Sequence, residues 1–263
     1  MGEIIVITSG KGGVGKTTTT ANLGTALALL DKRVIVIDAD IGLRNLDVVL
    51  GAEDKIIYDI MDVLSESCTL EQAIIQDKKN ANLHLLPASQ TATKDNIEPE
   101  QMQTLCAGLK EKYDFVLIDC PAGIEQGFKN AMGAAERALV IATPDVSSVR
   151  DADRIIRLLL VNDPQINSQL ILNRVRMDLV ERGAQMGIED ITEILPIDLI
   201  GVVPDDSDII IATSRGESVV IDNYSKSGAA YRDIARRMIG MSVEFMDLSE
   251  KTGFFARLRK AFK

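Results

Sequence analysis

The sequence predicts an α/β protein: a three-layer sandwich with a mostly parallel central sheet of seven or eight strands. Continuous apolar runs recur along the chain and end in polar or turn residues, as strands buried on both faces of a parallel sheet do. Helix-like stretches separate these runs, and the alternation favours right-handed crossovers with helices on both sides of the sheet. The runs are residues 3–9, 33–40, 82–88, 114–121, 138–144, 169–175 and 199–205.

The composition fits a core built from aliphatic side chains. Of the 263 residues, 46% are hydrophobic, whereas aromatic residues make up 4% and tryptophan is absent. No apolar run approaches the ~20 residues of a membrane span. The first strand-like run begins within three residues of the N-terminus, so we expect no signal peptide. The three cysteines are scattered, which favours a reducing cytoplasm over a disulfide framework.

Charge is unevenly distributed along the chain. The net charge of −10 argues against a general nucleic-acid-binding protein. Residues 251–263 nevertheless contain five basic residues and no acidic one, so the first 250 residues carry −15. We therefore expect one acidic domain over residues 1–248 and a separate basic tail over residues 249–263.

A phosphate-binding motif follows the first run. Gly10, Gly15, Lys16 and Thr17 fit the pattern G-x-x-x-x-G-K-[ST], between a predicted strand and a predicted helix. Glycines let the backbone N–H groups approach phosphate oxygens, and the helix N-terminus adds a partial positive charge. We expect Lys16 to contact the β- and γ-phosphates and Thr17 to bind Mg²⁺. The sandwich is therefore expected to be of the P-loop NTPase type. The residues expected to hold the nucleotide are Gly10, Lys11, Gly12, Gly13, Val14, Gly15, Lys16, Thr17 and Thr18.

Acidic residues end two further runs. Asp119 closes run 114–121, where a Walker B aspartate would hold Mg²⁺ directly or through water. Asp38 and Asp40 close run 33–40, which we expect to lie beside the first strand. Because phosphoryl transfer depends on positioning, Asp40 is the candidate for orienting the attacking water. The alternative for Asp119 is an aspartate at an ordinary turn, and the alternative for Asp38 and Asp40 is a solvated acidic loop.

The second lysine of the phosphate loop makes the motif more specific. "GKGGVGKTT" matches the deviant Walker A motif of the SIMIBI-class ATPases, which include MinD, the ParA/Soj partitioning ATPases and the nitrogenase iron protein. With "DADIGLRNLD", "LPASQT", "IDCPAGIE", "VSSVRDADR" and "GVVPDD", the chain resembles the MinD family over essentially its whole length.

The resemblance implies a Mg²⁺-dependent ATPase that dimerises with ATP and acts as a spatial switch in division-site placement. It assigns catalysis to Lys11, Lys16 and Asp40, with Lys11 reaching the phosphates held by the other subunit of a face-to-face dimer. A lysine in trans places positive charge where negative charge develops. The implied partners are a MinC-like inhibitor of FtsZ assembly and a MinE-like or other activator, with no specific nucleic acid. The implied partner surface comprises Arg44, Arg150, Asp151 and Asp153.

Other positions are matched less specifically. The resemblance places Asn173, Pro204 and Asp205 against the adenine, although Asn and Pro are also ordinary turn residues. Ser148-x-x-Asp151 also fits a capping box that opens a helix. Cys120 stands where the family more often has serine, and we interpret it as a small buried residue.

The C-terminal segment has the pattern of a membrane-targeting helix. At 100° per residue, its apolar side chains fall in an arc of roughly 120°, and its basic side chains fill the other side. A helix docked on its own domain is the alternative. The predicted membrane-contacting residues are Phe254, Phe255, Leu258 and Phe262, flanked by Arg257, Arg259, Lys260 and Lys263. The expected location is therefore the cytoplasm, with reversible attachment to an anionic membrane surface.

Two rival functions remain open at this point. A ParA/Soj-type partitioning ATPase would bind DNA or cargo, but it needs basic residues on its body, and this body is acidic. A non-catalytic or metal-cluster carrier of the same fold is the second rival.

Overall fold

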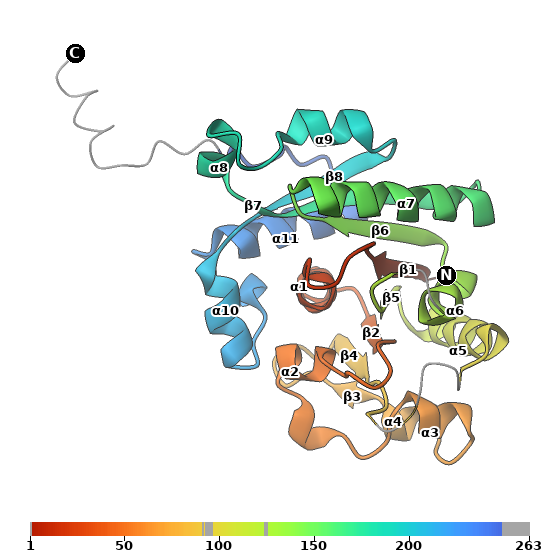
Figure 1. Ribbon diagram of the computed structural model, residues 1–263. Helices are drawn as coiled ribbons and strands as arrows, with labels where there is room; N and C mark the ends of the chain where they lie inside the picture. The colour runs from red at the N-terminus through yellow and green to blue at the C-terminus, as the bar shows by residue number, and fades with distance from the viewer. Residues whose placement is uncertain (1, 91, 93–96, 124–125, 249–263) are drawn as a thin grey trace.

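The computed structural model describes residues 2–90, 92, 97–123 and 126–248 (Figure 1). Its centre is an eight-stranded sheet in the order β3-β4-β2-β5-β1-β6-β7-β8. Neighbouring strands are parallel, except that β3 and β4 are antiparallel. The strands are β1 (Glu3–Thr8), β2 (Val34–Asp38), β3 (Ile75–Gln76), β4 (Leu83–Leu86), β5 (Phe115–Asp119), β6 (Arg137–Ala142), β7 (Asn167–Val175) and β8 (Asp198–Pro204).

The seven predicted strands are all present, and the expected fold class is confirmed. The additional strand, β3, has two residues and is too short to form an apolar run. The expectation that β2 lies beside β1 is wrong, because β5 pairs with both of them. Parallel neighbours are joined by crossovers rather than tight turns, so chain order does not fix strand order. The insertion of β5 brings Asp119 into register with Asp38 on one side and Ile7 on the other.

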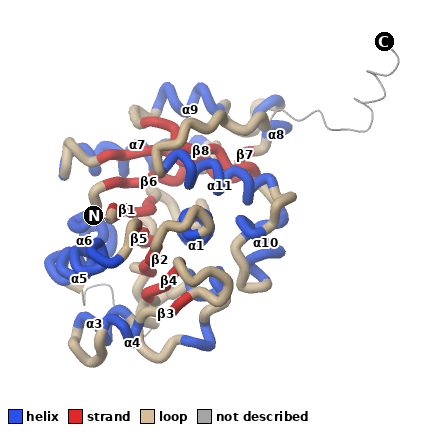
Figure 2. The backbone as a smooth tube through the Cα atoms, turned by 180° about the vertical axis from the view of Figure 1, so that it is seen from behind, coloured by secondary structure: helices blue, strands red, loops and turns tan. Residues whose placement is uncertain are grey.

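Helices cover both faces of the sheet, as Figure 2 shows from behind. One core cluster packs α1, α2 and α11 on the sheet, and the other packs α5, α6, α7 and α9 on its opposite face. The helices are α1 (Lys16–Ala28), α2 (Leu46–Leu50), α3 (Ile60–Leu64), α4 (Leu70–Ala73), α5 (Pro99–Lys112), α6 (Gln126–Ala134), α7 (Val146–Asn162), α8 (Met177–Glu181), α9 (Ile188–Ile194), α10 (Ser207–Ser214) and α11 (Lys226–Met238), with 3₁₀ turns η1 (Glu53–Lys55) and η3 (Val219–Ile221).

Helix α7 begins three residues earlier than the capping box predicted from Ser148 and Asp151. Its N-cap is Asp145, whose carboxylate accepts the Ser148 N–H at 2.9 Å. The Ser148 side chain is buried and accepts the N–H of Thr143 at 3.0 Å. The predicted capping box is therefore wrong: Asp145 has the extended backbone and the free acceptor that an N-cap needs, and Ser148 already lies in the first turn.

Arg237 holds the last described residues against the sheet. Its guanidinium donates to the carbonyls of Ile200 (3.1 Å), Val243 (3.0 Å) and Glu244 (2.8 Å), and the ring of Phe245 lies 4.2 Å from its Cζ. These contacts hold residues 243–245 beside β8. The predicted tail, residues 249–263, lies outside the described residues. Within the described part of the chain, no helix is both long and apolar enough to cross a membrane.

Candidate nucleotide-binding site

The phosphate loop connects β1 to α1 and is open on one side. Gly13 and Gly15 have φ of 75° and 101°, a region that glycine enters without strain. A Cβ on Gly15 would lie 2.3 Å from Asn173 Nδ2, whereas one on Gly12 or Gly13 would meet nothing within 4 Å. No side chain caps α1, so its first N–H groups are available to an anion. The loop therefore has the form of a phosphate cradle.

Lys16 lies in this cradle. Its side chain is buried, and its ammonium donates to Ser9 Oγ at 3.1 Å. The Ser9 hydroxyl in turn donates to the carbonyl of Lys11 at 2.8 Å. A buried cation at the N-terminus of a helix suits the charge of a polyphosphate.

Two buried carboxylates lie beside Lys16, at the carboxyl ends of β2 and β5. Burial raises the pKa of Asp119, the negative charge of Asp38 raises it further, and hydrogen bonding to Thr17 and the charge of Lys16 lower it in part. Burial likewise raises the pKa of Asp38. Thr20 Oγ1 also lies 3.4 Å from Asp119 Oδ1. The two carboxylates repel each other in a poorly solvated place, and a divalent cation would relieve that repulsion.

The residues present fit a magnesium ion that accompanies a nucleotide. The predicted ligands Thr17 and Asp119 come together here, because the Thr17 hydroxyl bonds the Asp119 carboxylate. Among the described residues, no three His, Cys, Asp or Glu side chains form a metal-binding group. In phosphate sites, Mg²⁺ is usually bound by one or two protein oxygens together with phosphates and waters.

Asp38 organises the loop that carries Asp40. One of its carboxylate oxygens accepts the N–H of Asp40 at 3.0 Å, and the other accepts those of Asn45 at 3.0 Å and Leu46 at 3.1 Å. The sequence predicted a catalytic aspartate here but missed this role for Asp38, whose only signal was its place at the end of a strand. Arg44, in the same loop, has φ of 40°, and its Nε lies 2.9 Å from Asp47 Oδ2.

Lys11 points to α7. Its ammonium donates to Ser147 Oγ at 2.8 Å and lies 3.5 Å from Asp145 Oδ1. Burial acts to raise the pKa of Asp145, but hydrogen bonds from Ser147, Thr143 and Ser148 and the charge of Lys11 lower it to about 2. In the single chain, the signature lysine is thus held by the N-terminus of α7 through side chains that are about half exposed.

A cavity of about 410 Å³ lies beyond the phosphate loop and has the size of a small-ligand site. The three predicted adenine contacts, Asn173, Pro204 and Asp205, line it. Asn173 Nδ2 donates to the Val14 carbonyl at 2.7 Å, so this side chain also ties β7 to the phosphate loop. The sequence missed the other lining residues of this cavity, since nothing marked α10 as a wall of the site: Arg174, Asp206, Ile209 and Ile210.

Three of the four predicted partner residues, Arg150, Asp151 and Asp153, lie on α7. Arg150 is exposed on α7. Asp151 lies 3.6 Å from Arg154 and Asp153 lies 2.8 Å from Arg157, so each aspartate pairs along the helix. A Cβ on Gly10 would lie 2.3 Å from the Asp151 carbonyl, which shows how closely α7 packs on the loop.

Cys120 is buried, as expected from the sequence. Burial raises the pKa of its thiol above the usual range, and the neighbouring charge of Asp119 raises it further.

Comparisons with known proteins agree with this geometry. A protein-family model described as an AAA domain matches residues 2–172. The septum site-determining protein MinD of Bacillus subtilis is 51% identical over 264 residues, which cover 100% of this chain and 98% of that protein. In the solved MinC:MinD cell division protein complex of Aquifex aeolicus, a chain that is 46% identical superposes with a TM-score of 0.86, covering 93% of this chain and 98% of its own.

A third comparison bears on the ligand. The septum site-determining protein MinD of Pyrococcus horikoshii, solved in complex with Mg-ADP, is 32% identical and has a TM-score of 0.81, covering 90% of this chain and 96% of its own. The phosphate cradle, the paired carboxylates and these likenesses agree: this chain belongs to the MinD family of septum site-determining ATPases within the deviant Walker A group.

Proposed function

We propose that this chain is an ATP-dependent, dimerising and membrane-associating switch that acts in placing the division septum. The observation that carries the proposal is the position of Lys11. A half-exposed lysine at the open side of the phosphate loop, held by α7 through weak contacts, is available to a second subunit. The alternative is a loop lysine whose only role is its contact with Asp145 and Ser147 at the start of α7.

The residues of the cradle divide the work of ATP binding and hydrolysis. Lys16 and the loop N–H groups hold the phosphates, and the Asp38-anchored loop presents Asp40 to the water that attacks. Magnesium, when bound, would be held by Thr17 and by Asp119, directly or through water, and would neutralise the phosphate charge. Because hydrolysis depends on how the reacting groups are positioned, it needs the hydrogen bonds of Asp38 that hold the loop as well as Asp40 itself.

Dimerisation links the switch to ATP. In the proposed dimer, Lys11 leaves Asp145 and Ser147 and contacts the phosphates of the other subunit. The contact that it leaves is cheap to break, because ion pairs between exposed side chains contribute roughly 0–1 kcal/mol. ADP lacks the γ-phosphate that the face-to-face dimer is built around, so hydrolysis separates the subunits.

The partner surface is proposed on α7 and on the loop after β2. The Aquifex aeolicus protein was solved with MinC, and we extend that partnership to a MinC-like inhibitor of FtsZ assembly here. A MinE-like or other activator would reset the switch. The surface comprises Arg44, Arg150, Asp151 and Asp153. Because α7 packs directly on the phosphate loop at Gly10, a partner bound there would be sensitive to the nucleotide.

The tail is proposed to bind the inner face of the cell membrane. Its separated apolar and basic residues, read from the sequence, support this role. One such helix binds weakly, since each basic residue contributes at most about 1 kcal/mol near an anionic surface. Two tails joined in a dimer gain roughly 10²–10⁴ in avidity, so the membrane responds to the dimer and hence to ATP.

Co-sedimentation with liposomes, in ATP and in ADP, tests the proposal. We expect binding in ATP that rises with the content of anionic lipid, and little binding in ADP. Equal sedimentation with neutral and anionic liposomes in ADP would contradict the coupling. Retention on DNA-cellulose in ATP at low salt, without liposome binding, would instead support the partitioning ATPase.

A further inference from the structure

The carboxylate of Asp206 joins two segments of the chain. Its Oδ1 accepts the N–H of Asp208 at 3.0 Å, which caps α10. Its Oδ2 accepts the hydroxyl of Ser225 (3.0 Å) and both the N–H (3.1 Å) and the hydroxyl (2.9 Å) of Ser227, at the start of α11. An N-cap needs only the first of these bonds. The other three fasten the turn between β8 and α10, one wall of the proposed base cavity, to α11.

Helix α11 is joined in turn to α1, the helix that follows the phosphate loop. Tyr231 is fully buried, and its hydroxyl lies 3.2 Å from Thr19 Oγ1. One turn further along α1, Asn22 Oδ1 accepts the Ser218 hydroxyl at 2.6 Å and the Val219 N–H at 3.0 Å. In Figure 2, α11 lies next to α1. Buried hydrogen bonds therefore connect α1, which follows the phosphate loop, to the same part of the chain that binds Asp206.

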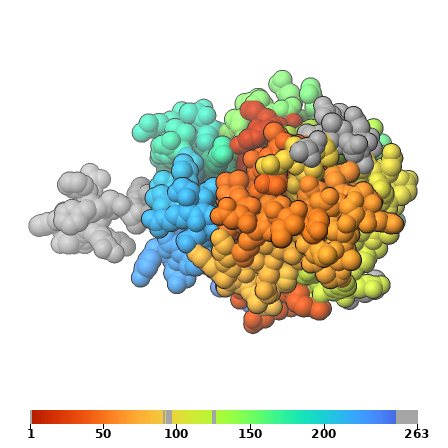
Figure 3. Space-filling model, turned by 90° about the horizontal axis from the view of Figure 1, so that it is seen from below, coloured from red at the N-terminus to blue at the C-terminus, as the bar shows by residue number. Residues whose placement is uncertain are grey.

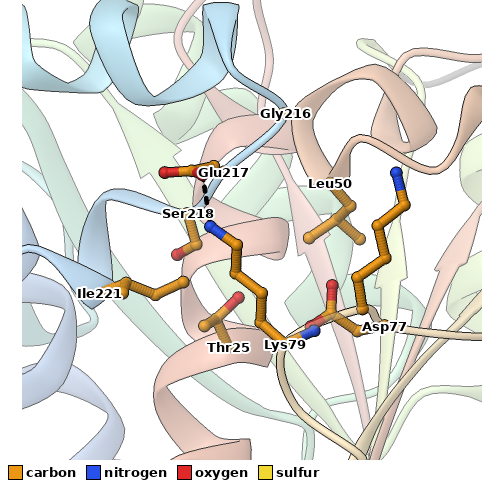
Figure 4. Close-up of a pocket in the computed structure, with 9 residues that line it drawn as sticks. Thr25, Leu50, Asp77, Lys79, Gly216, Glu217, Ser218 and Ile221 are labelled. Carbon is orange, nitrogen blue, oxygen red and sulfur yellow. Dashed lines mark hydrogen bonds and ion pairs between the residues drawn. The ribbon is translucent and has the colours of Figure 1, made fainter.

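The connection between α10 and α11 is braced from a third side. Lys79, in the turn between β3 and β4, pairs with Glu217 at 2.5 Å (Figure 4). A Cβ on Gly216 would lie 2.5 Å from the Gly51 Cα, and Figure 3 shows the segment around α2 (orange) directly against the segment around α10 (blue). The cavity drawn in Figure 4 measures about 30 Å³, room for about one water. This cavity is a small gap between packed segments and is too small to be a ligand site.

We propose that α11 is a brace that fixes the base cavity relative to the phosphate loop, and that Asp206 is the positioning residue through which it acts. The inference rests on the proposed nucleotide site, in which the cavity beside Asn173 receives the base. If the phosphate loop and the turn between β8 and α10 are held at a fixed separation, neither has to be reordered when a ligand contacts both of them. A ligand that touches the phosphate loop alone does not depend on that turn.

The chemistry of Asp206 makes this brace testable by a single-atom change. Burial acts to raise the pKa of Asp206, but hydrogen bonds from Asp208, Ser227 and Ser225 outweigh it and hold that pKa below the ordinary value. The carboxylate is therefore ionised at neutral pH and accepts all of its bonds. In Asp206→Asn, an NH₂ group replaces one acceptor oxygen and cannot accept from the serines or from the backbone.

Calorimetric titration of the full-length chain with Mg-ADP and with Mg-pyrophosphate distinguishes an effect on the base cavity from an effect on the phosphate loop. ADP spans both the cavity and the loop and keeps ATP-driven dimerisation out of the measurement. We expect Asp206→Asn to weaken ADP binding about tenfold, the loss of one hydrogen bond to a charged group, and to change pyrophosphate binding less than about twofold. The matched control is Asp233→Asn, which removes a carboxylate of α11 that pairs with Arg236 at 2.8 Å. It should leave both affinities unchanged.

A second variant covers the case in which Asp206→Asn does not fold. Ser227→Ala removes one hydroxyl from the junction and should weaken ADP binding about threefold, again without effect on pyrophosphate. Equal loss of both ligands, or unchanged ADP binding, in folded variants would overturn the brace. If the wild type binds ADP no more tightly than pyrophosphate, the base cavity itself is wrong, and the brace falls with it.

Discussion

The ammonium of Lys11 lies 3.5 Å from the carboxylate of Asp145, the residue that caps α7. The two residues connect the phosphate loop to the helix on which we place the partner surface. Their side chains are 45% and 46% exposed, so water screens the attraction and the pair is worth little in free energy. Lys11 is thus held near α7 by a contact that is easily broken.

Substituting Lys11 should uncouple ATP from dimerisation. Lys11→Ala removes the charge proposed to act in trans but leaves Lys16 and the loop N–H groups in place, so ADP should still bind within about threefold of the wild type. Light scattering of the variant with ATP should show monomers. The account of a trans-acting lysine fails if this protein dimerises like the wild type.

Substituting Lys16 should abolish tight nucleotide binding. Lys16 is the buried cation beside the acidic pair, so Lys16→Ala removes the main positive charge from the phosphates, and we expect at least about a hundredfold weaker ATP binding. Above about pH 8, where Asp119 is ionised, the substitution also leaves this carboxylate less compensated, which should lower the melting temperature of the nucleotide-free protein. Titration calorimetry and thermal melts measure both effects. Normal ATP binding by a folded variant would show that the phosphate loop is misassigned.

Substituting Asp40 should have the opposite effect to substituting Lys11. Asp40→Ala keeps the phosphate contacts and the Asp38 anchor at Asn45 and Leu46, but it removes the carboxylate proposed to orient water. We expect an ATP dimer that persists and hydrolyses at least about a hundredfold more slowly, the lower range for one general base. Phosphate release and light scattering on the same sample check this pairing of effects. Rapid hydrolysis by Asp40→Ala would show that another group orients the attacking water.

The stabilisation by magnesium nucleotide should depend on pH. Burial and the charge of Asp38 raise the pKa of Asp119 to about 8. A carboxyl whose pKa is raised by folding costs stability once ionised, so the nucleotide-free protein loses this contribution as pH rises from the ordinary carboxyl range through about 8. Magnesium bound at Asp119 would remove the cost. At about pH 6 it would first have to displace the proton, so Mg-ADP should raise the melting temperature more near pH 8 than near pH 6.

Two controls accompany that measurement. ADP with a chelator measures the pH dependence that comes from the nucleotide's own terminal phosphate, and Asp119→Asn should reduce the pH dependence of the Mg-ADP effect to that level. An equal gain from Mg-ADP at both pH values in the wild type would exclude Asp119 as the titrating ligand.

Removing the tail should separate membrane binding from the ATPase cycle. Deletion of residues 253–263 should leave ATP-dependent dimerisation intact and abolish co-sedimentation with anionic liposomes. Phe255→Asp should do the same, because it places a charge among the few apolar side chains that the sequence predicts to anchor this segment. If the truncated protein still sediments with liposomes in ATP, the membrane contact lies on the body of the protein.

The strands and the phosphate loop could be predicted because each depends on a local pattern. Seven buried strands appear as apolar runs, and Gly15 and Lys16 occupy positions fixed by the geometry of one turn. The position of β5 between β1 and β2 could not be predicted, since parallel strands are paired by distant crossovers. The predicted cap of α7 was three residues too late because Ser148 and Asp145 both fit the local rule, and only the packing of Ser148 against Thr143 decides between them.

The sequence by itself determined the chemistry of this protein: a glycine-rich loop with two lysines, acidic residues at the ends of strands, and a basic tail on an acidic body. The tertiary structure decided how those groups work together. Asp38 and Asp119 become a buried, mutually repelling pair only because β2 and β5 are neighbours. Asp206 becomes a junction only because residues about twenty positions apart meet at the start of α11. Both are long-range contacts set by packing, which no local pattern specifies.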